Sequence, residues 1–286
     1  MAPPFRVRRS LLFVPAVRPD RYPKALATGA DAVCIDLEDG VSFAAKDDAR
    51  EKAIALFAER TPVRAEVSLR INDPTTELGL RDLEAVRDAG IRPDALVVPK
   101  CGGIDAIRAA ADVLAETAPG LPVIAQIETA RGVAAAEAIA AATPDVSALF
   151  FGAVDYAADV GCRIEWDALL YARSRVVAAA AMAGVSALDT PFMDVPALDA
   201  LADESRRTRA LGFTGRAAIH PTQVAVIQAA YSPGADEVAW ARRIVAAYEQ
   251  QSGGVLLVDG KLIERPVIAA AQRTLAIADA VALADP

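Results

Sequence analysis

The sequence contains one histidine, His220, among its 286 residues. A zinc site built from several histidines is therefore excluded, and a Ser-His-Asp triad requires His220 as a member. Cysteine is also scarce. Cys34, Cys101 and Cys162 lie far apart without metal-ligand spacing, which favours a reducing, cytoplasmic location. Carboxylates must therefore provide most of any metal binding.

Positive charge is in deficit, because 30 Lys and Arg stand against 38 Asp and Glu. The resulting net charge of −8 argues against nucleic acid as the main partner. No apolar run approaches membrane-spanning length, and the apolar stretch 11–15 is shorter than the roughly 7–15 residues of a secretory signal. We therefore expect neither a membrane nor a nucleic-acid partner.

Aromatic residues are few, at 5%, whereas apolar residues make up 54%. This composition is typical of a parallel sheet covered by helices on both faces. Short β-rich segments alternate with longer Ala-rich segments, and no glycine fingerprint opens the first crossover. We predict a (β/α)8 TIM barrel with strands at 10–15, 31–36, 65–71, 94–98, 122–127, 147–151, 185–189 and 215–220, and helices at 44–60, 77–88, 103–117, 130–142, 165–183 and 196–211.

The pattern changes after the eighth predicted strand. Residues 221–252 indicate helices, 255–263 a hairpin, and 266–282 a last helix. We predict a catalytic barrel domain over 1–231 and a C-terminal extension over 232–286. The extension is expected to act as a lid or as an arm that docks on a neighbouring subunit.

Polar residues stand at or just beyond the end of every predicted strand. They are Arg18, Asp36, Glu38, Asp39, Arg70, Asn72, Lys100, Glu128, Asp155, Asp189 and His220. Polar residues often end strands because they start turns and cap helices. In a TIM barrel, however, these ends converge on the active-site mouth, so the full set favours a functional site. His220, followed by proline, is the member that we expect to be structural.

Glu128 and Asp155 each follow an apolar strand, so both carboxylates emerge from buried surroundings. A hard cation such as Mg2+ would relieve their repulsion, and Mn2+ is an alternative ion. The competing interpretation is that the two acids cap the segments that follow them. Arg70 has the planar fork that suits a carboxylate, although a salt bridge to Glu38 or Asp39 would equally explain it.

Several segments carry a family likeness in one order along the chain. They are RRSLLFVPAVRPDRYPKALATGADAVCIDLEDGV (8–41), SLRIN (68–72), VVPK (97–100), QIETARGV (126–133), FFGAVDYAADVG (150–161), SALDTPF (186–192) and AIHPTQV (218–224). Together they resemble citrate lyase β-subunit-like proteins of the HpcH/HpaI aldolase superfamily, a group with malyl- and citramalyl-coenzyme A lyases. The resemblance covers essentially the whole chain.

The resemblance implies a barrel enzyme that binds Mg2+ through Glu128 and Asp155 and contacts substrate through Arg70. Such enzymes cleave a 3-hydroxyacyl-coenzyme A to an acyl-coenzyme A and a 2-oxo acid, or condense the two. Thioester hydrolysis on the same scaffold, and a subunit that works only with an acyl-carrier partner, are the alternatives. A homo-oligomer, a trimer or a hexamer, is also expected. The remaining assignments are catalytic roles for Asp36 and Glu38, and substrate or coenzyme A contacts for Arg18, Arg21, Lys24, Lys100 and Asp189.

Three positions depart from the family pattern. Val154 stands where relatives often have an acid, and Arg216 where a lysine is common. The tail reads GKLIE (260–264), so the catalytic acid that relatives supply across the subunit interface as Asp is here Glu264. The extra methylene changes its reach by about 1.5 Å. The alternative for Glu264 is a surface charge beside Lys261 or Arg265.

Overall fold

The computed structural model describes residues 6–250 and 256–284. The chain divides into two compact units, 1–230 and 231–286, and each is described by itself. Within the described residues, no helix is both long and apolar enough to cross a membrane.

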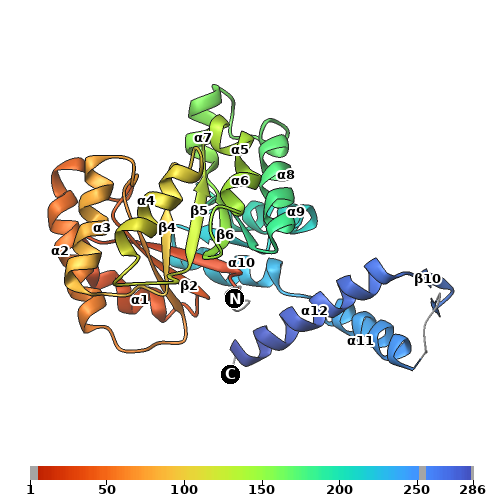
Figure 1. Cartoon of the computed structure of the whole chain (residues 1–286). Helices are drawn as coiled ribbons and strands as arrows, with labels where there is room; N and C mark the ends of the chain where they lie inside the picture. The colour runs from red at the N-terminus through yellow and green to blue at the C-terminus, as the bar shows by residue number, and fades with distance from the viewer. Residues whose placement is uncertain (1–5, 251–255, 285–286) are drawn as a thin grey trace. The chain divides into compact units, whose positions relative to one another are not determined.

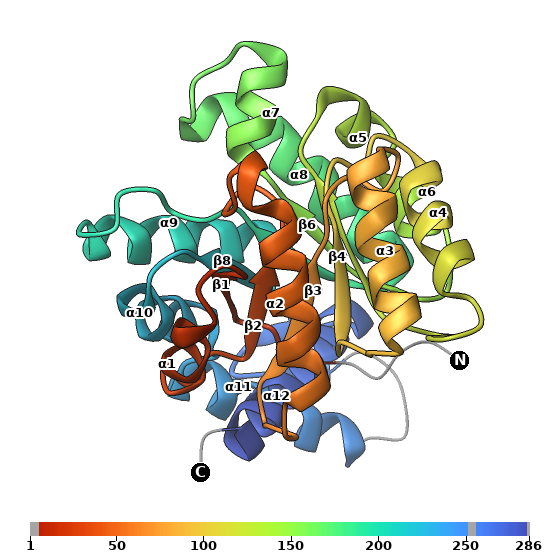
Figure 2. The same ribbon diagram turned by 90° about the vertical axis from the view of Figure 1, so that its left-hand side faces the viewer.

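The first unit is a closed barrel of eight parallel strands in the order β1 to β8 (Figures 1 and 2). The strands are β1 (Ser10–Pro15), β2 (Ala32–Asp36), β3 (Glu66–Arg70), β4 (Ala95–Val98), β5 (Val123–Ile127), β6 (Val146–Phe151), β7 (Ser186–Asp189) and β8 (Gly215–Ala218). β1 pairs with both β2 and β8, which closes the sheet. The predicted (β/α)8 architecture is therefore confirmed.

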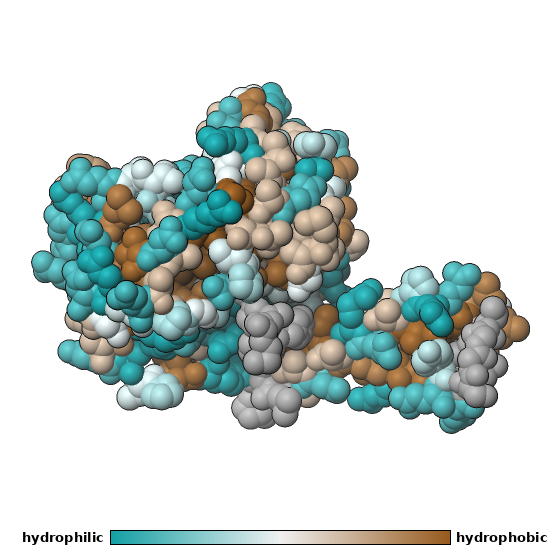
Figure 3. All heavy atoms as spheres, viewed as in Figure 1, coloured by the Kyte–Doolittle hydropathy of each residue, from teal (hydrophilic) through white to brown (hydrophobic). Residues whose placement is uncertain are grey.

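Helices surround the strands, and α2, α3 and α4 lie side by side outside β2–β4 (Figures 1 and 2). The helices of this unit, with two 3-10 turns η1 and η2, are η1 (Pro19–Arg21), α1 (Tyr22–Leu26), η2 (Phe43–Ala45), α2 (Lys46–Glu59), α3 (Glu77–Ala89), α4 (Ile104–Leu114), α5 (Ala130–Ala134), α6 (Ala136–Ala140), α7 (Ala153–Val160), α8 (Trp166–Ala183), α9 (Leu198–Leu211) and, at the junction of the units, α10 (Pro221–Tyr231). The surface over α2 and α3 is mostly hydrophilic (Figure 3).

Some details differ from the sequence-based expectation, and two of them concern the segments after β5 and β6. The helix expected over 130–142 is divided at Ala135, whose φ of −100° and ψ of 8° lie outside helical geometry. The short helix α7 was not expected, and it ends where Gly161 adopts a left-handed conformation with φ of 71°. Glycine adopts that conformation without the steric cost that a Cβ atom brings.

An apolar cluster fills the barrel, with residues from seven of its eight strands. Its buried members are Leu11, Ala32, Cys34, Ala95, Val97, Ile124, Ala148, Phe150, Leu188 and Ala217, with Phe13 packed against them. Successive side chains of a strand point to opposite faces. Asp36, two residues after Cys34, and Gln126, two after Ile124, therefore continue the inward-facing rows at the C-terminal end of the barrel. Arg70 stands above this core, with its guanidinium 4.5 Å from the centre of the Phe13 ring.

Buried ion pairs close the opposite, N-terminal end of the barrel. Arg8 pairs with Glu66 at 2.8 Å, and Arg9 pairs with Asp31 at 2.8 Å. A pocket of about 420 Å³ also opens at this end, beside Arg60 and Asp94. Since TIM-barrel active sites lie at the C-terminal ends of the strands, these groups serve stability rather than the candidate site.

Within residues 231–250 and 256–284, the second unit contains two helices and a hairpin. They are α11 (Ala235–Glu249), β9 (Leu256–Val258), β10 (Lys261–Ile263) and α12 (Arg265–Ala284). The two strands pair antiparallel across a turn in which Asp259 and Gly260 both have positive φ, as an Asp-Gly hairpin turn requires. Ile244, Ile263 and Ile268 bury a small core between these elements. The hairpin expected from the Asp-Gly pair is thus present in its described part, 256–263.

Candidate active site

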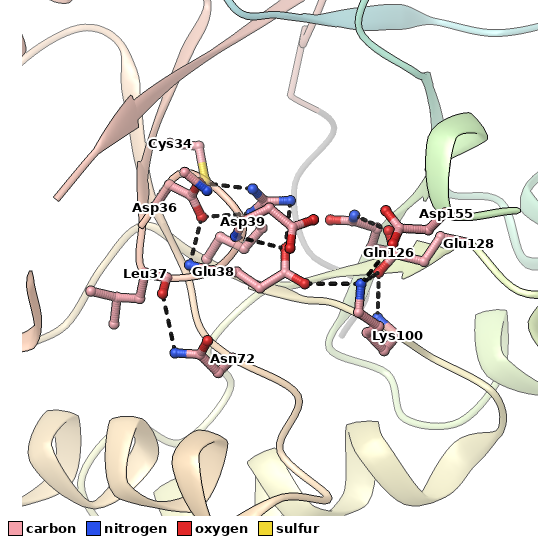
Figure 4. Close-up of polar contacts among 12 residues, drawn as sticks. Cys34, Asp36, Leu37, Glu38, Asp39, Asn72, Lys100, Gln126, Glu128 and Asp155 are labelled. Atoms are coloured by element: carbon pink, nitrogen blue, oxygen red, sulfur yellow. Dashed lines mark hydrogen bonds and ion pairs between the residues drawn. The ribbon is translucent and has the colours of Figure 1, made fainter. Parts of the chain in front are cut away.

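The ends of β2 to β5 and the start of α7 bring six charged side chains together at the barrel mouth (Figure 4). They are Asp36, Glu38, Arg70, Lys100, Glu128 and Asp155, and we call them the mouth cluster. Four of the six are carboxylates and two are cations. Glu128 and Asp36 are buried, whereas the Lys100 and Asp155 side chains are 34% and 38% exposed. The cluster is therefore open to solvent on the side of Lys100 and Asp155.

Arg70 is held in one orientation by two carboxylates. Its Nε and NH2 groups donate to the two oxygens of Asp36 at 2.7 and 2.8 Å, and NH1 lies 2.9 Å from Glu38 Oε2. Burial alone would lower the pKa of Arg70, but Asp36 and Glu38 raise it above its ordinary value. Arg70 is thus a fixed cation, and the expected pairing with Glu38 is present together with one to Asp36.

The loop after β2 is itself rigid. Asp36 accepts hydrogen bonds from the backbone of Glu38 and Gly40, both at 2.9 Å. Lys46 Nζ donates to the carbonyls of Leu37 and Glu38 at 2.7 Å. These bonds fix the two carboxylates that hold Arg70, so the loop orients Arg70.

Glu128 is completely buried, and both of its oxygens have partners. Oε1 accepts from the backbone of Lys100 at 2.7 Å, and Oε2 accepts from Gln126 Nε2. The capping interpretation of Glu128 is wrong, because Thr129 caps α5 by accepting from Gly132 N. Burial, with Glu38 and Asp155 adding to it, raises the pKa of Glu128 to about 7. A carboxyl in this position gains stability from a nearby cation.

Lys100 supplies that cation in the structure. Its Nζ lies 3.1 Å from Glu38 Oε1, 3.7 Å from Glu128 Oε1 and 3.0 Å from Asp155 Oδ1 (Figure 4). Burial alone would lower the pKa of Lys100, but Glu128 and Glu38 raise it. Lys100 also has a φ of 55°, a left-handed conformation that is costly for a residue with a side chain.

Gly152 allows the β6–α7 junction to approach Glu128. A Cβ atom at this position would lie 2.6 Å from both Glu128 Cβ and Glu128 Oε2. Its φ of −101° is open to any residue, so the requirement for glycine is steric. The absence of a side chain brings the first turn of α7, with Asp155, against β5.

The donor set of the mouth fits a magnesium ion. No group of three or more His, Cys, Asp and Glu arranged for a metal occurs within residues 6–250 and 256–284. Mg2+ does not need one, since it commonly takes one or two carboxylates and completes its shell with substrate and water oxygens. Glu128 and Asp155 face the same Lys100 ammonium, which shows that their oxygens already converge on a positive charge.

Other predicted residues are on the segment after β1, in the segment that follows β8, and in the second unit. Arg18, Arg21 and Lys24 are exposed on the segment after β1, and Arg18 pairs with Asp20 at 2.8 Å. Exposed His220 bonds to Thr222 through Nδ1 at 2.8 Å. Glu264 lies in the second unit, where its carbonyl accepts from the first turn of α12.

Asp189 is placed differently from the expected substrate contact. Its side chain is fully buried and bonds to Arg173 and to Arg216, with Glu204 joining both guanidinium groups. Arg216, one of the departures from the family pattern, is therefore a partner of Asp189. A buried carboxylate between two guanidinium groups is costly to separate from them. The structure thus does not bring Asp189 into the mouth cluster.

Sequence reasoning missed three residues that shape the mouth. Gln126 bonds to Glu128, Lys46 secures the β2 loop, and Phe13 supports Arg70. Gln126 could have been found from the sequence. It lies two residues before Glu128, and residues two apart along a strand face the same side of the sheet. Lys46 gave no signal, since its position at the start of a helix resembles that of many exposed lysines.

Residues 9–221 match the model of the HpcH/HpaI aldolase/citrate lyase family. The chain therefore belongs to this family, and it is an enzyme of a lyase family. A citrate lyase subunit beta-like protein of Mycobacterium tuberculosis is 38% identical, covering 92% of this chain and 93% of its own.

Two further relatives have names that specify reactions. Mitochondrial citramalyl-CoA lyase of Mus musculus is 31% identical, covering 96% of this chain and 87% of its own. A (3S)-malyl-CoA thioesterase of Cereibacter sphaeroides is 34% identical, covering 96% and 95%.

A solved structure agrees with the fold. Protein CitE of Mycobacterium tuberculosis, in complex with magnesium, acetoacetate and coenzyme A, is 35% identical with a TM-score of 0.78, covering 96% of this chain and 98% of its own. This neighbour supports the barrel fold of the chain.

Proposed function

We propose that the chain is a Mg2+-dependent lyase for a 3-hydroxyacyl-coenzyme A such as malyl- or citramalyl-coenzyme A. The products are an acyl-coenzyme A and a 2-oxo acid, and the same site would catalyse the condensation. The observation that carries the proposal is the convergence of Glu128, Asp155 and Arg70 at one barrel mouth. The names of the relatives support the same class of reaction.

Glu128 and Asp155 are the residues that would hold the ion, with Mn2+ as a second ion of suitable chemistry. When bound, the ion would polarise the carbonyl oxygen of the 2-oxo acid as a Lewis acid. Arg70 would bind the oxo-acid carboxylate or the oxygen on which charge develops. Asp36 and Glu38 would hold the Arg70 fork in place, because both already pair with it.

The coenzyme A end of the substrate requires cations outside the mouth. Arg18, Arg21 and Lys24 follow β1, whose C-terminal end opens on the same side of the barrel. Their exposure leaves them available to the phosphates of coenzyme A. We therefore assign this segment to coenzyme A, and we assign Asp189 to supporting β7 and β8 through its pairs with Arg173 and Arg216.

The α-carbon of the acyl product gains a proton in cleavage and loses one in condensation, so the reaction needs an acid or a base. We assign it to Glu264 on the C-terminal extension, which would act as a lid across the interface of a homotrimer or hexamer. A general base must come within roughly 2.6–3.2 Å of its proton. The side chain of Glu264 is one methylene longer than the Asp of the family pattern, so its backbone would have to stand farther back.

Thioester hydrolysis is the second candidate, and one relative carries that name. The altered acid, Glu264, favours it, because a misplaced proton donor would slow carbon–carbon chemistry and leave the thioester open to water. The third hypothesis is that the chain is a subunit that works only beside an acyl-carrier partner. The hairpin and helices of 231–286 argue against it, since they would supply the lid from a copy of this chain rather than from a different protein.

The deciding experiment measures two products at once. The purified chain is incubated with Mg2+ and malyl- or citramalyl-coenzyme A, and the 2-oxo acid and free thiol are quantified together. We expect stoichiometric oxo acid without free thiol. Thiol without oxo acid would identify a hydrolase, and no product without a carrier protein would favour the subunit alternative.

Variants connect that activity to the mouth. Glu128→Gln and Asp155→Asn are each expected to lower metal-dependent turnover by at least about a hundredfold, a typical loss when a group that stabilises the transition state is removed. Asp48→Asn makes the same charge change at an exposed pair on α2 and should leave turnover unchanged. Near-normal turnover in either mouth variant would refute the metal assignment.

A further inference from the structure

Lys100 is the mouth residue whose position has no explanation in the reaction described so far. Its ammonium lies 3.0 Å from Asp155 Oδ1 and 3.7 Å from Glu128 Oε1, the carboxylates assigned to the metal. Its third contact is Glu38 Oε1 at 3.1 Å. An ammonium and a divalent cation that bind the same oxygens must compete for them.

The backbone keeps the base of the Lys100 side chain beside these acids. Lys100 N donates to Glu128 Oε1 at 2.7 Å, and the residue adopts a left-handed φ of 55°. Such a conformation persists only where the surroundings enforce it. The side chain beyond it is 34% exposed, and a lysine stem has several rotatable bonds, so the ammonium can move away while the backbone contact to Glu128 remains.

We propose that Lys100 is a tethered counter-ion that competes with the divalent cation for Glu128 and Asp155 and passes its charge to the anionic 2-oxo acid when the cation binds. Two consequences follow. Lys100 weakens cation binding when no oxo acid is present, because the ammonium must first be displaced. The oxo acid relieves this penalty when it is present, because the displaced ammonium then gains a carboxylate partner. Cation and oxo acid therefore bind with positive coupling.

The inference rests on the metal assignment of the proposed function, so its test must separate the two. Mn2+ binding is measured by the loss of the free-ion paramagnetic resonance signal, with and without pyruvate as the oxo-acid probe. This readout needs no turnover. Wild type, Lys100→Asn, Lys100→Arg, Lys52→Asn and Glu128→Gln are compared. At position 100, Asn removes the charge and tolerates a left-handed backbone, whereas Arg keeps the charge. Lys52→Asn is the control, because it removes the same charge from a surface ion pair on α2.

We expect Lys100→Asn to bind Mn2+ about tenfold more tightly than wild type without pyruvate, since a positive charge within a few ångströms is removed. Pyruvate should tighten Mn2+ binding several-fold in wild type and in Lys100→Arg, and much less in Lys100→Asn. Lys52→Asn should match wild type. A merely structural role for Lys100 cannot give this pattern, because damage to the mouth would weaken the binding of Mn2+.

Unchanged or weaker Mn2+ binding in Lys100→Asn, while Glu128→Gln abolishes binding, would overturn the role of Lys100 and leave the metal site standing. Equal Mn2+ binding in wild type and Glu128→Gln would instead overturn the metal assignment itself. If Lys100→Asn does not fold, Lys100→Gln, which also removes the charge, takes its place with the same expected result.

Discussion

Glu128 shows how a single side chain can be prepared for a cation before one arrives. The side chain is completely buried, and Glu38 and Asp155 add negative charge around it. An ionised carboxylate in such surroundings is unstable unless hydrogen bonds and positive charge compensate it. Gln126 and the backbone of Lys100 supply the hydrogen bonds, and the Lys100 ammonium supplies part of the charge.

This balance predicts that metal binding depends on pH. Burial raises the pKa of Glu128 to about 7, so below that pH a proton occupies the carboxyl and above it the carboxylate is available. Because a metal ligand must be deprotonated, Mn2+ affinity should rise as pH increases through about 7 and then level off. Calorimetric titrations with Mn2+ between about pH 5.5 and 8.5, a range centred on the pKa of Glu128, measure this change in affinity.

Removing a neighbouring charge provides the control for the pH effect. Glu38→Gln should move the midpoint to lower pH, because Glu38 is the charged group that raises the pKa of Glu128 most after burial. Asp48→Asn, at an exposed pair on α2, should leave the midpoint in place. Mn2+ affinity that is flat across this range would contradict the assignment of Glu128 as a ligand.

At the scale of elements, the mouth depends on how closely the β6–α7 junction approaches β5. β5 pairs with β6 in parallel up to Ile127 and Phe151, so their next residues, Glu128 and Gly152, are neighbours. Gly152 provides the space for the Glu128 side chain. The position of Asp155 relative to Glu128 is therefore set by a glycine rather than by a bond between the two acids.

Gly152→Ala should accordingly damage the site while sparing the fold. The added Cβ would meet Glu128 Cβ and Oε2 at 2.6 Å, so the Glu128 carboxylate must shift. We expect Mn2+ affinity to fall at least about tenfold, with a destabilisation of about 1–3 kcal/mol from overpacking. Mn2+ titration and urea unfolding measure the two effects.

Gly234→Ala is the matched control for this substitution. Its added Cβ would meet nothing closer than Glu237 Oε2 at 3.7 Å, and its φ of −71° suits alanine. Metal affinity should therefore stay at the wild-type value. If Gly152→Ala also bound Mn2+ normally, the Glu128 side chain would have more freedom than its contacts indicate.

The same elements show how far the sequence predicts the structure. The eight strands and the hairpin could be predicted because each has a local pattern of apolar residues ended by turn residues. The mouth could be predicted as a group because strand ends converge in a barrel. Asp189 could not be distinguished from the others, since its partners Arg173 and Arg216 lie on α8 and β8, far away in sequence.

Specific pairings were also beyond the sequence. That Arg70 is held by Asp36 as well as Glu38, and that Lys100 faces Glu38, Glu128 and Asp155, depends on side-chain geometry at the end of the barrel. Thr129, not Glu128, caps α5, although both stood at the right place for a cap. Competition between neighbouring polar residues for one partner is settled only by tertiary packing.

At the scale of the whole molecule, the residues proposed for catalysis come from both compact units. The mouth cluster belongs to 1–230, whereas Glu264 belongs to 231–286. If the chain forms a homo-oligomer in which Glu264 serves the mouth of another copy, each active site combines residues from two chains. A chain with an inactive mouth but an intact lid could then restore activity to a chain with an intact mouth but an inactive lid.

Mixing two inactive variants tests this arrangement. Glu264→Ala and Glu128→Gln are each expected to be inactive in the assay for the 2-oxo acid. When they are mixed and allowed to exchange subunits, about a quarter of the sites should combine an intact mouth with an intact lid, if each site takes its two parts from different chains at random. Turnover should therefore return to about a quarter of the wild-type value, in proportion to the sites restored.

Exchange must be verified for the result to count. A tag on one variant and pull-down of the other measures mixed oligomers directly, and wild type mixed with Glu128→Gln gives the reference for dilution. Mixed oligomers without restored turnover would place the working Glu264 on the same chain as its mouth, because then no mixed site contains both intact parts. Turnover by Glu264→Ala alone would remove Glu264 from the chemistry and leave the mouth cluster as the whole catalytic apparatus.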